Sequence, residues 1–113
     1  MSKLYIVFKM TLNAGEEESF KDYVRQLEQL VKDKCPQTIG YEWFLNEEET
    51  QCVAVETFAD SDALMFHADT VLDLAMKLFA TCEIQEVNLL GNPSDAVIER
   101  TSAYGAKVHR LIS

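Results

Sequence analysis

The sequence predicts an α+β fold in which strands and helices follow in the order β-α-β-β-α-β. Several short segments alternate in polarity or are rich in β-branched and aromatic residues, whereas two longer segments repeat apolar residues at helical spacing. The chain has 113 residues, 48% of them hydrophobic, which suits one domain with a substantial core. We expect residues 1–113 to form a single domain, with a core of residues 1–92 and a C-terminal extension of residues 93–113.

The first element is a strand over residues 3–12, KLYIVFKMTL, in which every even-numbered position from 4 to 12 is apolar and shares one face. A helix is expected next, because the glutamates at 16–18 suit the positive end of a helix and apolar residues recur after them at helical spacing. Lysines suit its negative end, and Cys35-Pro36 stops it.

Two β-rich runs, TIGYEWFL at 38–45 and QCVAVETF at 51–58, are joined by the acidic loop NEEET and predict a hairpin. On the second run Glu56 stands on a face that is otherwise apolar. Alternation places four residues of the first run on one face, namely Ile39, Tyr41, Trp43 and Leu45.

A second helix is expected from about residue 61 to residue 81, with Asp60 as its N-cap. EIQEVNLLG then predicts a strand, and a short helix follows, with Pro93 near its first turn and Gly105 just past its end. AKVHRLIS adds a final strand. This order is the ferredoxin-like, split β-α-β pattern. One apolar stripe of the second helix contains Leu64, His67, Val71, Leu74 and Leu78.

Bulky residues stand on both faces of the predicted sheet. Phe8 opposes Tyr5 and Val7, and Trp43 opposes Phe44. A sheet that is apolar on both sides needs a second covering layer, and the chain offers no spare element to supply it. We therefore expect two copies to pack sheet to sheet as a two-fold homodimer.

Charge and cysteine content exclude several classes of protein. The net charge is −9, from 19 acidic and 10 basic residues, which argues against nucleic acid and anionic membrane as partners. No apolar run has the length of a signal peptide or approaches the roughly 18 residues of a membrane span. The three cysteines are widely spaced without CxxC, so we expect reduced thiols in a cytoplasmic protein and no metal site.

The stretch VAVETFADSDALMFHADT resembles a segment of the antibiotic biosynthesis monooxygenase (ABM) family of dimeric α+β barrels. In that family a strand ends in Glu-x-aromatic, an acidic turn follows, and the next helix carries alanine and then histidine. The tail GNPSDAVIERTSAYGAKVHRLIS also resembles the C-terminal extension of some small members. The matching positions here are Glu56, Phe58, Asp60, Asp62, Ala63 and His67.

The resemblance implies a cavity between sheet and helices in which a quinol or polyphenol is oxidised by molecular oxygen. Such enzymes need no flavin, metal or haem, because the substrate anion itself supplies the electron; we therefore expect no cofactor. Related haem-degrading members use an Asn, Trp and His set. Asn13, Trp43 and His67 do not match that pattern well, so haem degradation is not carried over.

His67 is the candidate catalytic residue, because an imidazole titrates near neutrality and is able to take a phenolic proton. Leu64 and Val71 lie on the same helical stripe and are expected to flank it in the cavity wall. The alternative is a core histidine that donates a hydrogen bond to a strand carbonyl or to Glu56.

Tyr41 and Trp43 share a strand face and are candidates for an aromatic wall against a planar ligand. Their alternative role is in the sheet core or the dimer interface. Glu56 is the remaining candidate for substrate binding. Its alternative is a structural ion pair, for example with Arg25 or Lys9, since buried charges are paired.

Three functions remain open from the sequence. The first is a cofactor-independent monooxygenase that acts on a small aromatic or quinol-type substrate. The second is a non-catalytic dimer that binds a small ligand or serves as an assembly unit. The third is an isomerase of the muconolactone type, which shares the fold and needs a general base but no oxygen.

Overall fold

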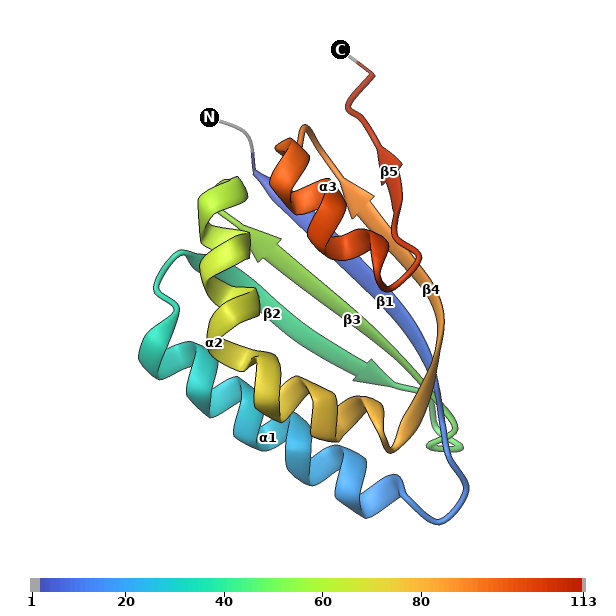
Figure 1. Ribbon diagram of the computed structural model, residues 1–113. Helices are drawn as coiled ribbons and strands as arrows, with labels where there is room; N and C mark the ends of the chain where they lie inside the picture. Colours follow the sequence, from blue (N-terminus) through green and yellow to red (C-terminus); the bar gives the residue numbers. More distant parts are fainter. Residues whose placement is uncertain (1–2, 113) are drawn as a thin grey trace.

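A computed structural model describes residues 3–112 and contains all the expected elements (Figure 1). They follow in the order β1 (Leu4–Leu12), α1 (Glu17–Lys34), β2 (Thr38–Leu45), β3 (Gln51–Phe58), α2 (Ser61–Phe79), β4 (Cys82–Leu90), α3 (Asp95–Ser102) and β5 (Lys107–His109).

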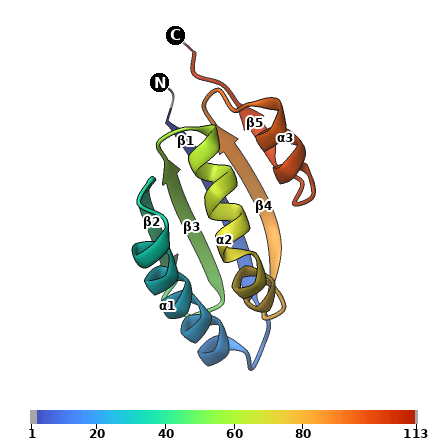
Figure 2. The same cartoon turned by 60° about the vertical axis from the view of Figure 1, so that its left-hand side comes forward.

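One sheet has the strand order β2-β3-β1-β4-β5. The first four strands pair antiparallel, and β5 adds to β4 in parallel. The three helices lie on the same face of the sheet, with α2 between α1 and α3 (Figure 2). The arrangement of β1 to β4 with α1 and α2 confirms the expected ferredoxin-like α+β fold, to which α3 and β5 add a further helix and an edge strand.

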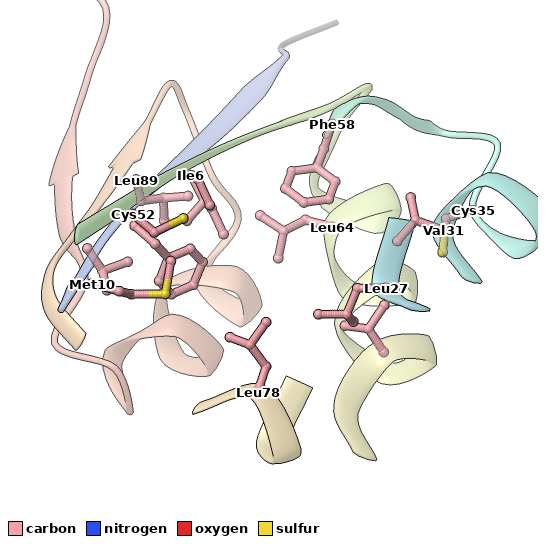
Figure 3. Close-up of a cluster of buried hydrophobic side chains, with 14 of the residues drawn as sticks. Ile6, Met10, Leu27, Val31, Cys35, Cys52, Phe58, Leu64, Leu78 and Leu89 are labelled. Atoms are coloured by element: carbon pink, nitrogen blue, oxygen red, sulfur yellow. The ribbon is translucent and has the colours of Figure 1, made fainter. Parts of the chain in front are cut away.

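The hydrophobic core fills the space between the sheet and the helices. Every even-numbered position of β1 from 4 to 12 is buried, as the alternation predicts, and the even-numbered positions of β3 are buried opposite them. Figure 3 shows side chains from the strands, such as Ile6 and Met10, directed toward the same interior as Leu64 and Leu78 of α2. Burial of this apolar surface is the main stabilising contribution.

The helix ends agree with the sequence in part. Asp60 is the N-cap of α2, because its side chain accepts a hydrogen bond of 2.8 Å from the backbone of Ala63. The helix ends at Phe79, two residues earlier than expected. Pro93 lies near the first turn of α3, as predicted, directly before Ser94, which is the N-cap of that helix.

The expected alternation along β2 is wrong at its first residues. Thr38 pairs with Phe58 while Gly40 pairs with Thr57, so that β2 has one extra residue at this point. This bulge leaves Ile39 52% exposed and turns Thr38 toward the helices.

The face of the sheet away from the helices is apolar and has no covering layer among residues 3–112. Tyr5 is 37% and Phe44 54% exposed on it, and three valines between them, Val7, Val53 and Val55, are only half-buried. These exposures match the two-sided apolar sheet that the sequence indicates. The homodimer itself stays a prediction.

The three cysteines are free and buried. Burial raises the pKa of the Cys52 and Cys82 thiols to about 11 and also raises that of Cys35, so all three are protonated at neutral pH. Among the described helices, none combines the length and the apolar character that a membrane span requires.

Candidate active site

A cavity of about 80 Å³ lies between α2 and the covered face of the sheet, and α3 closes one side of it. This space matches the volume of about two to three water molecules and is roughly half that of a cavity that binds benzene, so an aromatic ligand requires the walls to move apart. Its walls are mostly apolar side chains of β1, β2, β3 and α2. A few polar groups project into an otherwise apolar cavity, as is typical of small-molecule sites.

The structure brings all the predicted site residues together around this cavity. The residues in its wall include Tyr41, Trp43, Glu56, Leu64, His67 and Val71. They come from β2, β3 and α2, so the fold, and not proximity in sequence, assembles them. Their roles in binding and catalysis stay predictions.

Glu56 points from the middle of β3 into the interior and is 7% exposed. Burial raises the pKa of its carboxyl to about 8, so the group is protonated at neutral pH. The ion pair considered from the sequence is not formed, because Arg25 lies 3.7 Å from Asp22 and Lys9 is exposed on β1. The basic group that faces Glu56 is His67.

His67 is 4% exposed and has a protein group near each ring nitrogen. Its Nδ1 lies 2.9 Å from Oγ1 of Thr38, a hydrogen bond, and its Nε2 lies 3.5 Å from Oε1 of Glu56, a looser contact. The rings of Tyr41 and Phe58 meet the imidazole nearly edge-on, with centroids at 5.2 and 5.0 Å. Burial lowers the pKa of His67 to about 4, so the imidazole is neutral at neutral pH.

His67 therefore combines both alternatives that the sequence left open. It is a buried histidine that faces Glu56, and it also borders a cavity. One nitrogen is firmly bonded, whereas the contact to Glu56 is long enough to shorten or to open when a ligand binds. The pair is uncharged at neutral pH and is able to pass a proton between its two members.

Tyr41 and Trp43 form the aromatic wall, with ring centroids 5.6 Å apart and perpendicular planes. Burial and then the nearby Glu56 raise the pKa of the Tyr41 hydroxyl far above its usual range; the indole N–H of Trp43 opposes this rise. That N–H is nevertheless buried without a hydrogen-bond partner in the described part of the chain. An unpaired buried donor costs about 1–3 kcal/mol, and this nitrogen has almost no accessible surface, so the ring must turn before a ligand reaches it.

Sequence reasoning missed two contributions to the site. Thr38 was overlooked because alternation placed Ile39 at that point of the strand. Arg100 and Tyr104 of the C-terminal extension also line the cavity, and Arg100 joins Asp69 of α2 at 2.8 Å. The spacing of the buried Val97 and Thr101, four residues apart, was the available signal that α3 packs inward.

Asn13 lies outside the cavity. It is exposed after β1, where its side chain reaches the backbone oxygen of Ala80 at 3.4 Å. Trp43 and His67 line the cavity without it. The Asn, Trp and His set of haem-degrading relatives is therefore not assembled here.

The structure shows a ferredoxin-like α+β domain with a cavity beside an aromatic wall, and comparison with known sequences places it in a family. The sequence profile described as antibiotic biosynthesis monooxygenase matches residues 4–73. The chain belongs to this family, as its motif indicated. No curated protein sequence gives a significant match.

Solved structures share the fold at low sequence identity. MupZ from Pseudomonas fluorescens is 17% identical with a TM-score of 0.87, and the match covers 98% of this chain and 91% of MupZ. SnoaB from Streptomyces nogalater, a cofactor-independent oxygenase, is 14% identical with a TM-score of 0.69, covering 83% and 96% of the two chains. A conserved protein from Methanosarcina mazei is 18% identical with a TM-score of 0.68, covering 79% and 91%. Since the match to MupZ spans nearly the whole chain, it includes the C-terminal extension.

Proposed function

We propose that this protein is a cofactor-independent monooxygenase that oxidises a small phenol or hydroquinone bound in the cavity. The observation that carries the proposal is the uncharged Glu56–His67 pair, which opens onto an apolar cavity with an aromatic wall. Membership of the family supports it, as does the shared fold with an oxygenase that needs no cofactor.

In the proposed reaction the pair accepts the proton of a substrate hydroxyl, and the resulting anion supplies an electron to oxygen. One oxygen atom ends on a ring carbon of the substrate, and the other leaves as water. The substrate loses two hydrogens in all, for a phenol one from that carbon and one from its hydroxyl, so no external reductant is required. The indole N–H of Trp43 would donate to a substrate oxygen once the ring turns toward the cavity, because it has no partner within the described chain. The apolar walls exclude water from the radical pair.

The same pair favours a second candidate, an isomerase of the muconolactone type. Moving a proton between two carbons of a substrate needs an acid–base group near its working pH and no oxygen. A carboxyl with a pKa of about 8 beside a neutral imidazole meets that requirement.

Oxygen uptake with a panel of hydroquinones, naphthohydroquinone among them, tests the proposal after subtraction of spontaneous oxidation. We expect the unaltered protein to consume oxygen and Glu56→Gln to lose this activity. Glu42→Gln, at an exposed position of β2, is the control and should keep it. Deuterium exchange into a lactone substrate without oxygen consumption identifies the isomerase instead. Ligand binding without either reaction rejects both and leaves a binding protein.

We also propose that the protein works as a homodimer joined through the open face of the sheet. The partner is a second copy because the exposed Tyr5 and Phe44 lie on the one sheet face that the described helices leave bare, and a two-fold contact covers that face in both copies at once. Sedimentation equilibrium at micromolar concentration tests this, and a monomer there contradicts it.

A further inference from the structure

We propose that Thr38 is a positioning residue that fixes the tautomer of His67 and extends the Glu56–His67 pair to the protein surface as a path for protons. The inference rests on the proposed function, because it supplies the route for the proton that the reaction removes from the substrate. Thr38 itself does not line the cavity; its role is exerted through His67.

The three side chains form a continuous line of polar atoms across the core. Glu56 Oε1 lies 3.5 Å from Nε2 of His67, and Nδ1 of the same ring lies 2.9 Å from Thr38 Oγ1. Glu56 and His67 border the cavity, whereas Thr38 borders two grooves on the outer surface, one beside Glu28 and the other beside Asp60. One end of the line therefore borders the cavity, and the other end lies in a partly exposed residue beside the surface grooves.

The β-bulge at the start of β2 builds this line. Without it the apolar side chain of Ile39 would face the helices, as the alternation of Tyr41 and Trp43 requires. The bulge turns Thr38 to His67 instead, and bulges commonly re-aim side chains beside active sites. Gly40 permits the distorted pairing, because an added Cβ would lie 2.9 Å from Oγ1 of Thr57. The chain thus places a hydroxyl where regular pairing would place a larger apolar group.

Each member of the line is able to accept one proton and release another without becoming charged. Glu56 holds its carboxyl proton toward Nε2, and His67 holds its single proton on Nδ1, donating it to Thr38 Oγ1. When the substrate hydroxyl delivers a proton to the free oxygen of Glu56, the carboxyl proton moves to Nε2, the Nδ1 proton moves to Thr38, and the Thr38 hydroxyl proton leaves to water. The substrate remains as the anion that reacts with oxygen.

The reverse transfer resets the line. The overall oxidation releases no net proton, so the proton required for cleavage of the oxygen–oxygen bond returns from water through Thr38 and His67 to Glu56. No buried ion forms on any of the three side chains at either stage, which matters because an isolated charge is strongly disfavoured in this interior.

The tautomer is measured on ligand-free protein labelled with ¹⁵N-histidine, from two-bond proton–nitrogen correlations. The chain has two histidines, and the exposed His109 is assigned with His109→Gln. We expect His67 to carry its proton on Nδ1 in the protein and in Thr38→Ser, and on Nε2 in Thr38→Val. Thr57→Val, on the neighbouring strand, is the matched control and leaves the tautomer unchanged. An Nε2 proton in the unaltered protein, or no change in Thr38→Val, overturns the proposal.

The path is measured on the same samples and in turnover. Exchange of the His67 ring proton with water is expected to be about tenfold slower in Thr38→Val than in Thr38→Ser. With naphthohydroquinone, Thr38→Val is expected to lower kcat about tenfold with KM nearly unchanged, and Thr38→Ser to restore it. If Thr38 were purely structural, replacing it with valine would not slow exchange of the His67 ring proton, and it would not lower kcat while leaving KM unchanged. Absence of oxygen uptake by the unaltered protein defeats the proposed function, while ring-proton exchange still decides the path.

Discussion

Phe58 and Phe44 lie on neighbouring strands of one sheet, yet Phe58 is fully buried and Phe44 is 54% exposed. The difference comes from the two faces of the sheet. Phe58 faces the helices, which cover it with apolar side chains, whereas Phe44 faces the side that none of the described helices covers. Similar side chains are thus packed in the hydrophobic core on one face and exposed on the other.

The covered face is also where the polar exceptions occur. Glu56 and His67 are buried there among apolar residues, and the cavity lies beside them. The open face carries no comparable buried pair in the described chain, and its charged residues, such as Lys9 and Glu42, are exposed. A buried polar pair among apolar side chains on the covered face is a candidate functional site, whereas the exposed apolar surface on the open face is a candidate contact surface.

The largest expected difference is in stability. Phe58→Ala leaves a cavity in the core and is expected to lower the free energy of unfolding by about 3–5 kcal/mol. Phe44→Ala removes a half-exposed ring and is expected to cost about 1 kcal/mol or less within the subunit. Urea unfolding at low protein concentration measures both. Equal losses would contradict the contrast between the faces.

Dimer formation is expected to depend on the open face, whereas the stability of the subunit depends mainly on the covered face. Phe44→Glu places a charge on the proposed interface in both copies and is expected to weaken the dimer at least about a hundredfold, roughly 3 kcal/mol. Phe66→Glu is the matched control, because Phe66 on α2 is 55% exposed but lies away from the open face. Sedimentation equilibrium distinguishes them. An effect of the same size in Phe66→Glu would move the interface to the helices.

Sequence patterns predicted the covered face wherever strand alternation is regular. Along β1 and β3 the period of two identified the buried positions, Glu56 among them. The same rule failed at Thr38, because a bulge depends on the register with β3; Gly40 in TIGYEWFL was the local signal that one could form there.

The contact between Thr38 and His67 joins residues 29 positions apart, and the cavity also includes Arg100 of the C-terminal extension. Such juxtapositions follow from tertiary packing and cannot be obtained from periodicity. The family motif nevertheless placed His67 near the start of α2 and on its buried side, because the histidine lies one turn after the buried Ala63.

The buried pair on the covered face predicts an unusual dependence of stability on pH. The pKa of Glu56 is raised from 4.5 to about 8, so its contribution to the free energy of unfolding is lost as pH rises through that range. The pKa of His67 is lowered from 6.5 to about 4, so its contribution is lost as pH falls through that range. Between pH 4.5 and 6.5 the two effects oppose each other. Above pH 6.5 the effect of Glu56 alone remains, and stability is expected to fall by about 2 kcal/mol up to pH 8.

Glu56→Gln is expected to remove this alkaline loss, while Glu42→Gln on the open face retains it. Tyr41 is the titratable group beside the pair, and Glu28 and Cys35 act on Tyr41 in turn. Subtracting the variant curve from that of the unaltered protein isolates Glu56. Denaturant unfolding at several pH values gives both curves. Parallel curves for Glu56→Gln and the unaltered protein would show that the carboxyl ionises normally in the fold.

The smallest effect is expected at Gly40, where a change on the open face reaches the covered one. In Gly40→Ala the new Cβ would lie 2.9 Å from Oγ1 and 3.1 Å from Cβ of Thr57, so the bulge must shift. We expect a loss of about 1 kcal/mol in stability, at the lower end for overpacking, because the Thr57 side chain is able to rotate away. Thr57→Ala in the same chain should recover part of that loss, since it removes the nearer of the two contacts, and a double-mutant cycle measures the coupling.

The covered face provides the second readout for Gly40→Ala. If the bulge holds Thr38 against His67, Gly40→Ala alters the ring-nitrogen signals of His67 although the substituted residue lies on the opposite side of the sheet. Unchanged signals together with the stability loss would mean that Thr38 keeps its position without the bulge.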